Sequence, residues 1–134
     1  MFKALLISSA LLGMTVALSG CQTMGFGDDG LAYDAPYGSI AYSDSTRAWA
    51  VVSDLPTPNA ARASAVATCG FDDCKALTVF GKGICATIAL DGEWVNPHYQ
   101  WALNKKPQKA KSLALQRCEA GGGADCRTSP PVCN

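Results

Sequence analysis

The sequence has few of the residues from which metal and catalytic sites are built. Histidine occurs once, as His98, and no two of the seven cysteines are spaced as CxxC. Zinc sites usually combine such pairs with further cysteines or histidines, and cysteine catalysis needs a base beside the thiol. The glycines of GGGA (121–124) precede a cysteine instead of opening a helix, so they do not predict a phosphate loop. We therefore predict no metal, no cofactor and no enzymatic activity.

The net charge is zero, because the 11 basic and 11 acidic residues cancel. The charges are unevenly distributed: residues 21–100 hold four Lys/Arg against nine Asp/Glu, and residues 101–134 hold six against two. The basic segment is too small to indicate nucleic-acid binding. This distribution predicts a charge-polarised surface and no nucleic-acid partner.

Only one long apolar run occurs, from Ala4 to Ala17, after the single charge of Lys3. A bilayer-spanning helix needs ~20 apolar residues, and no basic residue follows this shorter run. A positive residue, an apolar stretch and small residues in this order are typical of a secretory signal peptide. We predict that residues 1–20 form one; the alternative is an N-terminal membrane anchor that stays attached.

The stretch Leu18-Ser19-Gly20-Cys21 resembles the lipobox of bacterial lipoproteins. The resemblance implies that the peptide is cut before Cys21 and that this cysteine carries lipid, which anchors the chain in a membrane. For a lipoprotein of this kind, Gln22 in place of aspartate after the cysteine implies sorting to the outer membrane, with the protein facing the periplasm. The alternative is ordinary cleavage with Cys21 in a disulfide. Cysteine number favours the lipoprotein, because removing Cys21 leaves an even six.

The mature chain, residues 21–134, is long enough for one small domain. Residues 21–36 are rich in glycine and aspartate without any regular period, which predicts a flexible tether. We expect one folded domain at 37–134, built from two repeats at 37–82 and 83–134. Alternating apolar residues predict strands near 37–43, 47–54, 74–80, 83–90 and 98–103, and alanine-rich segments predict helices at 57–69 and 106–118.

The two predicted helices align without a gap at a spacing of 49 residues, from Pro58 with Pro107 to Cys69 with Cys118. In each, alanines and the final cysteine recur at i, i+4 and i+8, so a narrow face of small residues can pack closely. A second cysteine follows each helix. The pattern predicts an α+β fold: a small disulfide-stapled domain of two ββαβ-like repeats with an approximate internal twofold, its sheets packed on the helices.

Residues 37–134 resemble the bacterial family known as domain of unknown function 4189. The matching segments are YGSIAYS with RAWAVV, the helices ending AVATC and ALQRC, DCKALTVF and ADCRTS, and ICATIAL followed by Trp94. This chain departs from the pattern where Lys105-Lys106-Pro107 opens the second helix and where Pro130-Pro131 shortens the last strand. The resemblance implies an exported fold and no established activity.

In an oxidising compartment the six remaining cysteines are expected to form disulfides. Six cysteines allow 15 pairings. If both repeats fold alike, helix-to-strand bonds Cys69–Cys74 and Cys118–Cys126 leave Cys85 and Cys133 to join the two halves.

Two surface features are candidates for binding. The first is the aromatic segment 96–101 with His98, Tyr99 and Trp101, which is either an exposed loop or part of the core. The second is the cluster Lys105, Lys106 and Lys109 (with Lys111), which is either a solvated helix face or a contact with an acidic partner or anionic lipid. Adjacent Asp72 and Asp73 are expected to stay solvated or to cap backbone groups.

These features favour a binding function over an enzymatic one. We expect a lipoprotein that binds an envelope or toxin protein, one concrete form being an immunity-type inhibitor of a lytic toxin or hydrolase. The alternative is a structural lipoprotein that contacts peptidoglycan or outer-membrane machinery.

Overall fold

The computed structural model describes residues 33–92 and 99–134, so the predicted signal peptide (1–20), Cys21 and His98 lie outside the described residues. It contains seven strands and two helices within these ranges. In chain order they are β1 (Tyr37–Tyr42), β2 (Trp49–Leu55), α1 (Pro58–Cys69), β3 (Lys75–Phe80), β4 (Cys85–Leu90), β5 (Tyr99–Asn104), α2 (Pro107–Ala120), β6 (Arg127–Thr128) and β7 (Val132–Cys133).

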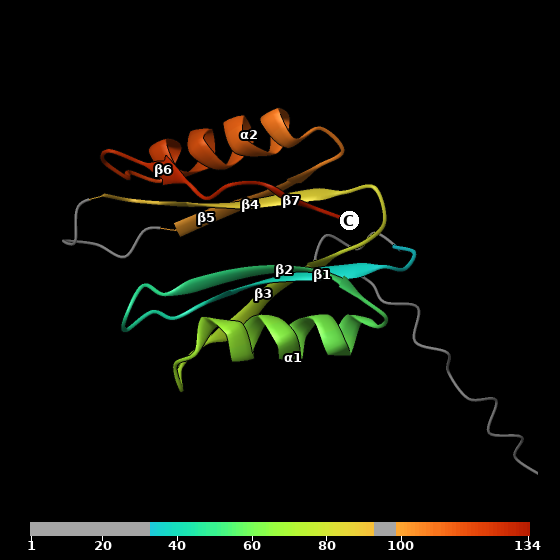
Figure 1. Ribbon diagram of the computed structural model, residues 1–134. Coiled ribbons are helices and arrows are strands. Elements are labelled where there is room, and N and C mark those ends of the chain that lie inside the picture. The colour runs from blue at the N-terminus through green and yellow to red at the C-terminus, as the bar shows by residue number, and fades with distance from the viewer. Residues whose placement is uncertain (1–32, 93–98) are drawn as a thin grey trace, which may run out of the picture.

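The elements form four layers, with α1 outside one antiparallel sheet and α2 outside a second, and the two sheets face each other (Figure 1). The first sheet has the order β2-β1-β3; in the second, β4 pairs with β5 on one side and with β6 and β7 on the other. This confirms the predicted α+β class, and the structure adds that the strands of both sheets pair antiparallel. The halves share their order of elements, and the duplication that would explain it stays a prediction.

Each helix packs on its sheet through the small-residue face that the sequence predicts. In α1 the residues Ala61, Ala65 and Cys69 are buried, and in α2 the same positions hold Ala110, Ala114 and Cys118. Small side chains allow the helix backbone to approach the sheet closely. The second helix continues for two residues beyond Cys118, further than the sequence pattern predicted.

Large side chains fill the space between the two sheets. Ile40 and Tyr42 of β1, Phe80 of β3 and Ile88 of β4 are fully buried there. The ring of Tyr99 lies against Tyr42, with 4.1 Å between the ring centroids. This layer holds the largest buried apolar side chains of the described residues, and burial of apolar surface is the main favourable term in folding.

Tyr99 and Trp101 are therefore not part of an exposed binding loop. Both lie in β5 and pack partly buried against the core between the sheets. Of the two alternatives for segment 96–101, an exposed loop or part of the core, the structure shows that residues 99–101 belong to the core. The physical reason is the strand alternation of β5, which turns every second side chain of this segment toward the opposite sheet.

The three disulfides join Cys69 to Cys74, Cys118 to Cys126 and Cys85 to Cys133, the pairing that the sequence suggested. The expected role of the third bond is wrong, however. Cys85 of β4 and Cys133 of β7 face each other across neighbouring strands of the second sheet. The bond therefore lies within one half and does not join the two halves.

The terminal residue Asn134 makes the contact between halves that the disulfide does not make. Its side-chain oxygen accepts a hydrogen bond from the Asp54 amide at 2.9 Å, and its side-chain nitrogen donates to the Phe80 carbonyl at 3.2 Å. Its backbone bonds to Gly83 and Ile84 in the turn that leads into β4. One residue thus ties β7 to both β2 and the end of β3.

Candidate functional site

The connections between elements gather at two opposite ends of the sandwich (Figure 1). We call one the pocket end; it comprises the β1–β2 loop (43–48), the α1–β3 turn (70–74), Asp91 and Gly92 after β4, and the α2–β6 turn (121–126). We call the other the tether end; it comprises residues 33–36, the β2–α1 connection (56–57), the β3–β4 turn (81–84) and the β5–α2 connection (105–106).

A pocket of about 440 Å³ opens at the pocket end, in the range of small-molecule sites. Both halves of the domain contribute to its wall. The lining residues are Thr46, Arg47 and Trp49 from the first half, and Leu90, Asp91, Gly92, Arg127, Thr128, Ser129 and Pro130 from the second.

Arg47 joins the two sides of this pocket. It sits in the β1–β2 loop with a positive φ of 61°, and its guanidinium donates a hydrogen bond to the backbone carbonyl of Asp91. It also lies beside the buried Tyr42. Burial raises the pKa of the Tyr42 phenol, and the nearby positive charge of Arg47 opposes that rise. The Arg47 side chain thus links the β1–β2 loop of the first sheet to the end of β4 in the second sheet.

Ser129 gives the opposite wall a fixed position. Its hydroxyl lies 3.0 Å from the Thr87 hydroxyl and accepts a hydrogen bond from the Ile88 amide at 3.2 Å. Arg127 is by contrast exposed, and its guanidinium lies 3.1 Å from the Asp125 carboxylate. Trp49 is 38% exposed. The pocket thus offers an accessible indole, an accessible guanidinium and fixed polar groups.

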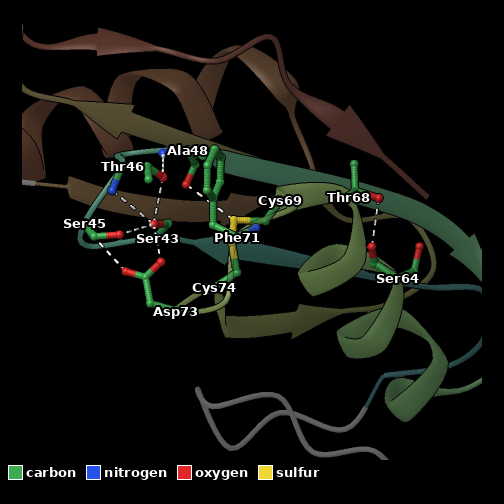
Figure 2. Close-up of a disulfide and its surroundings, with 10 residues drawn as sticks. All are labelled: Ser43, Ser45, Thr46, Ala48, Ser64, Thr68, Cys69, Phe71, Asp73 and Cys74. Atoms are coloured by element: carbon green, nitrogen blue, oxygen red, sulfur yellow. Dashed lines mark hydrogen bonds between the residues drawn. A yellow bond between two sulfur atoms is a disulfide. The ribbon is translucent and has the colours of Figure 1, made fainter.

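The β1–β2 loop is held in place by Asp73 of the neighbouring turn (Figure 2). Ser43 donates its hydroxyl hydrogen to Asp73 Oδ1 at 2.6 Å, and the Ser45 amide donates to Oδ2 at 2.9 Å. The Ser43 oxygen in turn accepts hydrogen bonds from the amide and hydroxyl of Thr46. These bonds stabilise the charged carboxylate, so the Ser43 hydroxyl above all lowers the pKa of Asp73. The expectation that this aspartate caps backbone groups is confirmed.

The same turn presents an exposed aromatic ring. Phe71 is 50% exposed, and its amide lies 3.3 Å from the Cys74 sulfur of the adjacent disulfide. The other sulfur of that bond, on Cys69, lies 3.5 Å from the carbonyl oxygen of Ala48. Ala48 directly precedes Trp49, so the disulfide brings the Phe71 turn close to Trp49. Phe71 and Trp49, the two most exposed large apolar side chains among the described residues, therefore lie at the same end of the first sheet.

The structure separates the binding residues that the sequence suggested from this pocket. Lys105, Lys106 and Lys109 are exposed as expected, but they lie at the tether end. Sequence reasoning missed Arg47, Trp49 and Arg127, because the pocket forms only when the sheets stack and bring distant loops together. The one available signal was Trp49, a large aromatic residue at the predicted start of a strand.

Metal-ligand clusters, free thiols and membrane-spanning helices are all absent from the described residues. Within residues 33–92 and 99–134 no group of three or more His, Cys, Asp or Glu side chains could hold a metal ion. All six cysteines of this part are in disulfides, and the Ser43 hydroxyl is engaged by Asp73 and Thr46. In the same part of the chain no helix is long and apolar enough to span a membrane.

Comparison with known proteins gives relatives in two mycobacterial species. The chain is 52% identical over 87 residues to Protein Rv1269c and Protein MT1307 of Mycobacterium tuberculosis and to Protein Mb1300c of Mycobacterium bovis. The alignment covers 65% of this chain and 63% of each relative, so the chain spans less than two thirds of their length. No solved structure matches. The family model described as "Domain of unknown function (DUF4189)" matches residues 37–133, which include both sheets, both helices and the pocket, and the chain therefore belongs to this family.

Proposed function

We propose that this protein is a lipoprotein of the outer membrane that faces the periplasm and binds another protein through its pocket end. The observation that carries the proposal is the arrangement of exposed groups at that end. Trp49 and Phe71 are 38% and 50% exposed, and Arg127 stands beside the pocket with its side chain in solvent. Tryptophan and arginine are enriched among the few residues that dominate binding energy in protein interfaces.

The scaffold supports binding because little of it has to become ordered. The β1–β2 loop is fixed by Asp73 and by Arg47, and the Phe71 turn is closed by the Cys69–Cys74 disulfide. A surface whose loops are already fixed loses less conformational entropy on association. The concrete form that we propose is an immunity-type inhibitor that blocks a lytic toxin or hydrolase near the outer membrane.

Affinity capture from cell envelopes tests this proposal. The bait is the mature chain 21–134 with Cys21→Ser, compared with the same chain carrying Trp49→Ala and Phe71→Ala. Truncation of an interface hot spot costs at least about 2 kcal/mol, so the double variant should retain the partner at least 30-fold less well. A matched bait with Lys105→Ala and Lys106→Ala should retain it fully, and circular dichroism should show all three baits folded.

Two outcomes would contradict the proposal. One is equal capture of the same proteins by all three baits. The other is that the wild-type bait is retained with purified peptidoglycan sacculi and with no protein, which would favour the alternative of a structural envelope lipoprotein.

A further inference from the structure

Four exposed lysines stand at the tether end, and we call Lys82, Lys105, Lys106 and Lys109 the lysine surface. The salt bridges found among the described residues, Lys75–Asp44 and Arg127–Asp125, both lie at the pocket end. The ammonium groups of the lysine surface therefore have no carboxylate within 4.0 Å in the part of the chain that the structure describes.

The position of these lysines is unfavourable for the helix that carries them. Lys106 is the N-cap of α2 and makes no side-chain capping bond, whereas Thr57 caps α1 by accepting a hydrogen bond from the Ala60 amide. Lys109 also lies in the first turn, where the positive end of the helix dipole repels a cation. Folding gains nothing from cations here, which points to a use outside the domain.

The chain enters the domain at the same end. The Lys82 amide donates to the carbonyl of Asp34 at 2.9 Å, so residues 33 and 34 lie against the β3–β4 turn. Gly81 makes this possible, because a Cβ there would lie 2.2 Å from the Tyr33 Cβ. Only 11 residues separate Cys21 from Tyr33, and even fully extended they reach no further than about 40 Å. A lipid on Cys21 would therefore keep the tether end close to the membrane.

We propose that the lysine surface lies against the anionic phospholipid headgroups of the membrane that holds the Cys21 lipid, and that the pocket end points away from that membrane. The proposal rests on the lipid anchor of the proposed function and is independent of the protein partner. Lysines near an anionic bilayer each contribute ~1 kcal/mol, and the attraction falls off within a Debye length of ~8 Å at physiological salt. The four lysines stand at the end where the chain enters the domain, so the tether allows this end to come within that distance of the bilayer.

Vesicle co-sedimentation tests the lysine surface without the lipid anchor. The probe is the mature chain 21–134 with Cys21→Ser, mixed with vesicles of equal parts phosphatidylglycerol and phosphatidylcholine or of phosphatidylcholine alone. Binding should require phosphatidylglycerol and should weaken in 0.5 M NaCl. The variant Lys105→Gln/Lys106→Gln/Lys109→Gln should bind roughly 100-fold more weakly, since ~1 kcal/mol per lysine is about fivefold each.

The matched control removes three cations at the pocket end: Lys75→Gln/Arg117→Gln/Arg127→Gln. It carries the same net charge as the lysine variant, and its binding should change less than about threefold, because these groups point away from the bilayer. Equal loss in the two variants would overturn the proposal, as would binding that ignores phosphatidylglycerol or no binding at all. All the substituted side chains are exposed, and circular dichroism should confirm that both variants fold. Capture of a protein partner is a separate readout, so either proposal can fail alone.

Discussion

The half with β1–β3 and α1 and the half with β4–β7 and α2 share a backbone irregularity at the same place. From Ile40 to Ala41, β1 advances by one residue while its partner β3 advances by two. From Ala86 to Ala89, β4 advances by three residues while the chain from β6 to β7 advances by four. Each outer strand thus carries one extra residue, the mark of a β-bulge. The two halves are therefore alike in how the central strand (β1 or β4) pairs with the outer strand (β3, or β6 with β7) beside the helix.

The halves differ in how the connections around this framework are held. The β1–β2 loop is bound by the Asp73 side chain, whereas Gly92 after β4 donates its amide to the carbonyls of Ala124 and Asp125. The outer strand is continuous in β3, but Pro130 and Pro131 divide its counterpart into β6 and β7, an arrangement tolerated only at a sheet edge. The Cys85–Cys133 bond crosslinks this divided strand to β4 and has no counterpart in the first half.

Removing the disulfides should give the largest difference between the halves. The Cys85–Cys133 bond closes a separation of 48 residues, and Cys85→Ala/Cys133→Ala should lower the free energy of unfolding by about 4 kcal/mol. The helix-to-strand bonds close separations of 5 and 8 residues, so removing Cys69–Cys74 or Cys118–Cys126 should cost about 2 kcal/mol each. Urea unfolding of the oxidised variants measures all three. Equal losses would mean that the divided strand gains no special stability from its crosslink.

The helix caps should give an intermediate effect, of opposite sign in the two halves. Thr57→Ala removes the bond to the Ala60 amide and should destabilise the domain by about 1 kcal/mol. Lys106→Thr supplies the missing cap to α2 and should stabilise it by about the same amount. Thermal and urea unfolding of both variants test this pair. No gain from Lys106→Thr would show that another contact already satisfies the start of α2.

The smallest effect should come from the loop contact of Asp73, and it should depend on pH. The pKa of Asp73 is lower in the folded state than its usual value of about 4. Its contribution is therefore fully present above pH 4 and is lost as the pH falls through the folded-state pKa. Asp73→Asn should thus destabilise the domain at neutral pH, and this difference from wild type should disappear in acid.

The control for this prediction is Asp72→Asn, because within residues 33–92 and 99–134 the Asp72 carboxylate accepts no hydrogen bond and shares the same exposed turn. Urea unfolding at several pH values separates the two variants. A loss with Asp73→Asn that persists at low pH would show that the loop depends on the shape of this side chain and not on its charge.

The local structure of the domain could be predicted from the sequence, because its signals are local. Thr57 and Pro58 mark the start of α1, alanines at i and i+4 mark the buried faces, and the paired cysteines after each helix restrict the disulfides. The stacking of the sheets could not be predicted in this way. It depends on contacts such as Tyr42 with Tyr99, which are far apart in the chain.

The pocket was missed for the same reason. Arg47 and Asp91 have no sequence pattern in common, and they meet only because the sheets face each other. Tyr99 and Trp101 are candidates for binding in the sequence because tyrosine and tryptophan occur in exposed binding surfaces as well as in cores. Only their burial distinguishes a binding loop from the core, and that burial depends on side chains of the opposite sheet.

The three disulfides also have a consequence for the chain before it folds. In chain-entropy terms they contribute about 8 kcal/mol together, comparable with the 5–15 kcal/mol by which typical domains are stable. Reduction of the three bonds should therefore remove a large part of a typical domain's stability. If the chain is exported as we propose, it should stay unfolded in the reducing cytosol, in the form that can be threaded through a translocation channel, and fold only where cysteines are oxidised. The crosslinks would then set the time and place of folding as well as its strength.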